Sequence, residues 1–219
     1  IEKLIKTGPV VTDGSWGTQL QNRGLKRGEC PDSWNLSHPE RVEEVAGQYV
    51  EAGSQIILTN TFGGNRLSLG RFNMGAKAVA INTAGVEISK KAAGNRAAVF
   101  ATIGPTGKML LTKETTEEEL QNAFEEQADA QARAGADGII VETMIDITEA
   151  GIAARAAKRT GLPVIASMVF DSGVDKDTTL MGVTPEAAAA AFAEIGVDGV
   201  GANCGQGIEG YIPICRRMR

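Results

Sequence analysis

The sequence predicts an α/β fold with a parallel sheet, and three similar segments support this prediction. Each has a glycine, a short apolar run and then a polar residue, and the segments span 52–60, 135–142 and 196–204. Glycine is typical of the position after a helix, and a short branched apolar run is typical of a strand buried on both faces. Repeated units of ~25–45 residues indicate parallel strands joined by helical crossovers.

Six strands are expected along the chain, near residues 9–13, 55–60, 98–103, 138–142, 163–169 and 198–203. Helices are expected near residues 39–52, 75–93, 117–134, 147–160, 185–195 and from about 208 onward. Two helix starts have the spacing of a capping box, Ser37-His38-Pro39-Glu40 and Thr116-Glu117-Glu118-Glu119. Thr184 followed by Pro185 predicts an N-cap with proline in the first turn.

Two closures of the sheet are compatible with these elements. A doubly wound sheet usually has a glycine-rich phosphate turn between its first strand and first helix, whereas residues 13–18 lead into a long loop. A (β/α)8 TIM barrel accommodates long loops at the C-terminal edge but needs eight strands. We therefore expect one barrel-type domain over residues 1–219, present as about six β/α units and lacking the last two strands.

The composition excludes several classes of partner. The 22 basic and 27 acidic residues give a net charge of −5 without blocks of like charge, so neither nucleic acid nor a membrane surface is an expected partner. No apolar run approaches the ~20 residues of a membrane span, and the first residues do not have the pattern of a signal peptide. Three cysteines make no disulfide framework, which predicts a reducing, cytoplasmic location.

Polar residues follow the apolar runs of several predicted strands. Asn60, Glu142, Asn203 and Cys204 occupy such positions, and Asp13 ends the first predicted strand. The carboxyl ends of parallel strands meet at one edge, where α/β proteins bind ligands. We therefore expect these side chains to converge on one site.

Two acids beside exposed amides suit a zwitterionic amino acid. A carboxylate at the end of a buried strand, such as Glu142, needs a structural salt bridge or a cationic ligand, because an unpaired buried charge is costly. Asp13 precedes Gly14 and Ser15, whose backbone N–H groups suit a ligand carboxylate, although Asp-Gly is also ordinary turn chemistry.

Cys204 has two interpretations, a small thiol that only packs and a metal ligand. A nucleophilic thiol needs a base, and the one histidine, His38, lies at a predicted helix start, where it is expected to be solvated. Cysteine-protease-like chemistry is therefore not expected. Gly205 and Gly207 precede a helix, and this pattern leaves a phosphate-binding barrel isomerase or lyase as a further alternative.

The ordered motifs of the chain resemble the homocysteine S-methyltransferase family, and within it the homocysteine-binding barrel of cobalamin-dependent methionine synthase. The motifs are Asp13–Thr18, Trp34–Leu36, Glu51–Gly53, Thr59–Phe62, Asn65–Arg66, Ile103–Thr106, Val141–Thr143, Gly182–Glu186 and Gly201–Cys204. They cover essentially the whole chain.

The resemblance implies a (β/α)8 barrel that holds one zinc ion through three cysteines. Cys204 matches the first of these ligands. The adjacent cysteine pair that supplies the other two has no counterpart within the 219 residues, and Cys30 and Cys215 do not match it. The zinc site is therefore expected to be incomplete in this chain.

By the same likeness, Glu142 binds the ammonium group of the substrate. Asp13, with the backbone of Gly14 and Ser15, holds the amino-acid end of homocysteine, and Asn60 and Asn203 are pocket groups.

The resemblance also implies the reaction, the transfer of a methyl group to the zinc-activated thiol of homocysteine to give methionine. No catalytic side chain is assigned, because the thiol needs no protein base. The sequence leaves the methyl donor open among methylcobalamin, a folate, a betaine and a sulfonium, and each is expected to need another domain or a partner such as a corrinoid protein. The alternative is a non-catalytic shortened barrel that acts as a binding or assembly domain and pairs its open edge in a homo-oligomer.

Overall fold

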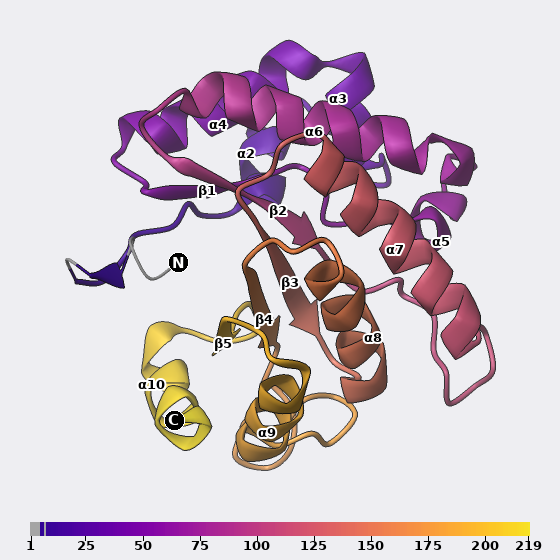
Figure 1. The fold of residues 1–219 in the computed structure, drawn as a ribbon, viewed down its shortest axis with the longest axis vertical. Coiled ribbons are helices and arrows are strands. Elements are labelled where there is room, and N and C mark those ends of the chain that lie inside the picture. The colour runs from indigo at the N-terminus through magenta and orange to yellow at the C-terminus, as the bar shows by residue number, and fades with distance from the viewer. Residues whose placement is uncertain (1–4, 7) are drawn as a thin grey trace.

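The computed structural model describes residues 5, 6 and 8–219 (Figure 1). Its strands are β1 (Ile56–Leu58), β2 (Ala98–Ile103), β3 (Gly138–Met144), β4 (Val164–Met168) and β5 (Gly199–Ala202). Its longer helices are α4 (Pro39–Glu51), α6 (Ala78–Ala93), α7 (Glu117–Arg133), α8 (Ile147–Lys158), α9 (Pro185–Ile195) and α10 (Ile208–Met218). Shorter helical segments are α2 (Trp16–Asn22), η1 (Pro31–Ser33), α3 (Trp34–Ser37), α5 (Arg66–Gly70) and η2 (Gly75–Lys77).

The five strands form one parallel sheet in the order of the chain, β1-β2-β3-β4-β5. Helices connect them on the outside, and α4, α6, α7, α8, α9 and α10 follow one another around the sheet (Figure 1). Each of these helices packs against the next. The arrangement confirms the predicted α/β class with a parallel sheet.

The prediction of a strand at residues 9–13 is wrong. This segment makes only an isolated parallel bridge, between Thr12 and Ile56. Asp13 N donates to Ile56 O at 3.1 Å, and in a regular parallel ladder the Asp13 carbonyl would next accept from Leu58 N. The Asp13 carboxylate accepts that hydrogen bond instead, at 2.7 Å. The ladder ends because a side chain takes the place of the backbone acceptor.

Two of the three predicted helix starts are confirmed. Thr116 and Glu119 form the reciprocal capping box at the start of α7. Thr184 Oγ1 accepts from Ala187 N, and Pro185 occupies the first turn of α9. These contacts satisfy backbone N–H groups that have no partner inside the helix.

The capping box predicted at residues 37–40 is wrong, because α3 is helical through Ser37 and α4 begins immediately after His38. His38 takes the N-cap position without a side-chain capping bond. Ser37 Oγ donates to Ser33 O, as expected for a serine within a helix. The His38 ring packs on Trp34 with 4.5 Å between ring centroids, so it is half-buried rather than solvated.

One apolar cluster joins the centre of the sheet to the helices. It contains Ile139 of β3 and Val164 of β4 together with Phe124 of α7 and Phe192 of α9, all fully buried. Burying a phenylalanine side chain contributes ~1.5–3 kcal/mol, so these rings fix the helices against the sheet. Within the described residues, no helix combines the length and apolar character needed to cross a membrane.

Candidate functional site

The C-terminal ends of β3 and β5 bring three of the predicted site residues together. Asn203 Nδ2 donates to Glu142 Oε2 at 2.9 Å and lies 3.4 Å from Cys204 Sγ. Thr143 Oγ1 lies 3.5 Å from the same sulfur. Glu142 is half-buried and Cys204 is exposed. We call Glu142, Thr143, Asn203 and Cys204 the rim cluster.

The backbone of the rim cluster is strained at two residues. Thr143 and Cys204 both have φ of 59°, in the left-handed region that non-glycine residues rarely adopt. The register between β3 and β4 shifts between Val141 and Met144, which accommodates Thr143. Thr143 N donates to Asn203 Oδ1 at 2.9 Å. Such conformations cost ~1–3 kcal/mol each and persist where surrounding contacts hold them, most often at functional sites.

The two acids of the site are held partly away from water. Burial raises the pKa of the Glu142 carboxyl, a hydrogen bond from Thr102 opposes the shift, and the negative charge of Asp13 adds to it. Burial likewise raises the pKa of Asp13 to about 6, against hydrogen bonds from Leu58 N and Trp16. Among the described residues, no cationic side chain contributes to either pKa. The pair therefore offers negative charge without a protein counter-ion.

Asp13 is fixed by two donors, since its Oδ2 accepts from Leu58 N and from Trp16 Nε1, each at 2.7 Å. Its effect on the pKa of Glu142 indicates that the two carboxyls lie within electrostatic range of each other. Ser15 is the N-cap of α2, and its Oγ accepts from Thr18 N at 3.4 Å. A Cβ on Gly14 would lie 3.1 Å from the Tyr49 hydroxyl oxygen, so the chain runs close to that ring.

Asn60 has a different environment from the rim cluster. It is 5% exposed, and its Nδ2 donates to Pro31 O at 2.8 Å and to Asn35 Oδ1 at 3.0 Å. These contacts tie the long first loop to the end of β1. No hydrogen bond in the described structure links Asn60 to the rim cluster.

Two residues that support the site were missed in the sequence. Thr102 of β2 donates to Glu142 Oε1, and Ser167 of β4 donates to Asn203 Oδ1 at 2.7 Å. Both are single polar residues inside apolar runs, close to the C-terminal ends of their strands. That position is the signal by which they could have been found.

The side chains of the described residues do not make a complete zinc site. No group of three or more His, Cys, Asp or Glu side chains among them is placed to hold a metal ion. Catalytic zinc takes three protein ligands, and Cys204 supplies one. Cys30 is buried beside Asp32, and Cys215 lies on α10.

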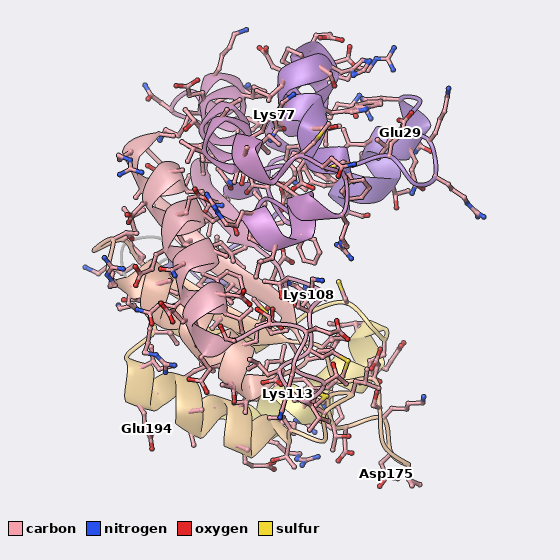
Figure 2. The ribbon with its side chains drawn as sticks, turned by 90° about the vertical axis from the view of Figure 1, so that its right-hand side faces the viewer. Glu29, Lys77, Lys108, Lys113, Asp175 and Glu194 are labelled. Atoms are coloured by element: carbon pink, nitrogen blue, oxygen red, sulfur yellow. The ribbon has the colours of Figure 1, made fainter. Side chains whose placement is uncertain are left out.

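The rim cluster lies on the side of the molecule where the loops after the strands emerge. Figure 2 shows Asp175, on the loop after β4, and Glu194, near the end of α9, on opposite sides. Helices between parallel strands run back to the amino ends of the strands. Glu194 therefore marks the amino edge of the sheet, and Asp175 the carboxyl edge with the site.

Comparison with known proteins yields one family and several relatives. The model of the family described as homocysteine S-methyltransferase matches residues 10–219. Methionine synthase of Mycobacterium tuberculosis is 31% identical over 218 residues, which cover 90% of this chain and 18% of that protein. Betaine–homocysteine S-methyltransferase 1 of Sus scrofa is 30% identical over 210 residues, which cover 93% of this chain and 73% of that protein.

A similar fold is found in the crystal structure of the metallated form of the homocysteine methyltransferase MmuM from Escherichia coli. The TM-score is 0.83 at 21% identity, and the match covers 99% of this chain and 81% of that one. The chain spans 18% of the length of each of the two mycobacterial methionine synthases that it matches.

Proposed function

Because the chain belongs to the homocysteine S-methyltransferase family, we propose that its rim cluster binds homocysteine and presents the sulfur for methylation to methionine. One observation carries the proposal. The Glu142 carboxylate has a protein donor on each oxygen but no cationic partner among the described residues, and Asn203 joins it to the exposed Cys204 thiol.

The ammonium group of an amino acid would supply the missing positive charge. Glu142 would accept from it with the lone pairs that Thr102 and Asn203 leave free, and Asp13 would add attraction across the rim. A charged hydrogen bond of this kind contributes ~1.5–3 kcal/mol. The backbone N–H groups at Gly14 and Ser15 are the proposed partners of the substrate carboxylate, and Asn60 is proposed as a pocket group behind them.

The sulfur of a homocysteine held in this way would point toward the exposed end of the rim cluster, where Cys204 lies. Methyl transfer forms a bond between sulfur and the methyl carbon while the bond between methyl and donor breaks, and the thiol proton leaves to solvent. Cys204 is the proposed zinc ligand of this chain. The other ligands of a complete site are not among the described residues.

The methyl donor is proposed to come from outside this chain. Methylcobalamin or a folate, on another domain or on a corrinoid protein, would fit relatives of which the chain spans only 18%. We propose a cytoplasmic location, which the small number of cysteines supports, because three cysteines make no disulfide framework.

We further propose that the sheet belongs to a (β/α)8 barrel and that residues 1–219 form its homocysteine-binding part. The sequential parallel order and the outer ring of helices support this. Val200 on the edge strand β5 is 39% exposed, as expected of a side chain that a further β/α unit covers. Light scattering tests the alternative that the chain is an assembly domain. A stable, zinc-free dimer of the intact protein that does not bind homocysteine would favour that alternative.

Glu142→Gln tests the binding site in the intact protein. Removing the charge should weaken homocysteine binding at least about tenfold in calorimetry, because the ammonium loses its ionic partner. Glu149→Gln is a matched control: Glu149 is 4% exposed, its pKa is also raised by burial, and its carboxylate accepts from Thr106 N at 2.8 Å.

The control variant should bind within about twofold of wild type. Methionine formation from an isotopically labelled methyl donor, followed by mass spectrometry, measures the reaction itself. Unchanged affinity in Glu142→Gln, or equal losses in both variants, would contradict the assignment of Glu142.

A further inference from the structure

A chain of hydrogen bonds crosses four strands beneath the site. Thr102 of β2 donates to Glu142 Oε1 on β3, and Asn203, just after β5, donates to Glu142 Oε2 at 2.9 Å. Ser167 of β4 donates from Oγ to Asn203 Oδ1 at 2.7 Å. Ser167 is thus the link through which β4 reaches the Glu142 carboxylate.

The orientation of the Asn203 amide decides whether it supports Glu142. Its Oδ1 accepts from Thr143 N at 2.9 Å, and because a backbone N–H can only donate, the NH2 group faces the carboxylate. Ser167 Oγ is a second donor to the same Oδ1, at 2.7 Å. In the reverse orientation Oδ1 would stand 2.9 Å from Glu142 Oε2, and two acceptors at that distance repel. Ser167 is only 6% exposed, so bulk water has little access to replace its donor.

We propose that Ser167 is a positioning residue of the homocysteine site. By tying the Asn203 amide to β4, it holds in place the group that donates to Glu142 and so aims the carboxylate at the substrate ammonium. The ligand in this inference rests on the proposed function. Ser167 itself does not touch the substrate. Without its hydroxyl, Thr143 N would be the one donor left on Asn203 Oδ1, and the amide would keep its orientation but lose its anchor on β4 and become more mobile.

Calorimetry of the intact protein tests the effect on binding with three variants. Ser167→Ala should weaken homocysteine binding about five- to tenfold, and Ser167→Thr, which keeps the hydroxyl, should restore it to within about twofold. Ser89→Ala is the matched control, because Ser89 is also buried and donates one hydrogen bond, to Leu58 O at 3.1 Å. It should lose thermal stability as Ser167→Ala does, yet keep its affinity.

NMR of the Asn203 side-chain amide tests its anchoring by Ser167 without any ligand. The two amide protons should shift or broaden in Ser167→Ala and return to their wild-type positions in Ser167→Thr. Unchanged signals in Ser167→Ala would overturn the inference. If wild type binds homocysteine and Ser167→Ala binds it with equal affinity, the inference about Ser167 is overturned and the proposed function remains. Wild-type protein that fails to bind homocysteine would overturn the proposed function and the ligand role of Ser167 together.

Discussion

Asp13 is the residue at which the sheet and the candidate site meet. Its carboxylate accepts from Leu58 N in place of a backbone carbonyl, and from Trp16 Nε1. Burial raises its pKa from 3.8 to about 6. The folded chain therefore binds this proton more tightly than the unfolded chain does, and the stabilising effect of the protonated form is lost as the pH rises through about 6.

Asp13→Asn should remove this pH dependence while keeping an oxygen acceptor for both donors. The free energy of unfolding of wild type, relative to the variant, should fall between about pH 4 and pH 7, by at most about 3 kcal/mol. Urea denaturation at several pH values measures the difference. A difference that stays flat, or that grows as the pH rises, would contradict the raised pKa.

At the scale of the element, the capping box of α7 gives a direct test of local stability. Thr116→Ala should lower the free energy of unfolding by ~1 kcal/mol, because Glu119 N loses its side-chain acceptor, while the reciprocal bond from the residue 116 backbone N–H to Glu119 is kept. Thr112→Ala, on the exposed loop before α7, is the control and should change it by less than ~0.5 kcal/mol. Equal losses in thermal or chemical unfolding would show that the box contributes nothing specific.

Sequence patterns predicted those elements whose ends depend on local residues. The strand expected near 98–103 is observed as Ala98–Ile103, and the helix expected near 185–195 as Pro185–Ile195. The segment at 9–13 has the same apolar character but does not form a strand. Its ladder is interrupted by the Asp13 side chain, and this contact between distant residues has no signature in a local pattern.

In the candidate site, too, local patterns predicted some residues, while others depend on contacts between distant parts of the chain. The end positions of strands predicted that Glu142, Asn203 and Cys204 would lie together, and the structure places them in one hydrogen-bonded cluster. Ser167 could not be linked to Asn203 in advance. Their contact depends on the register of two strands, in which Ser167 lies opposite Gly201.

At the scale of the whole molecule, we expect the 219-residue chain to bind zinc less tightly than an enzyme with all three zinc ligands. Cys204 stands without two further ligands among the described residues, so we expect zinc titration of the chain to show no tight tetrahedral thiolate site. Cobalt substitution followed by absorption spectroscopy is the measurement. Strong thiolate-to-cobalt charge-transfer bands would contradict this expectation.

The hydrogen bond from Leu58 N to the Asp13 carboxylate also links the candidate site to β1, the edge strand of the sheet. A bound cation would favour the ionised carboxylate, and an ionised acceptor strengthens its hydrogen bond to Leu58 N. Residues 11–13 would then lose their hydrogen bonds to residues 55 and 56 less often. Ligand binding at the candidate site would thus reduce the motion of residues 11–13, which lie near the opposite end of the sequence from Cys204.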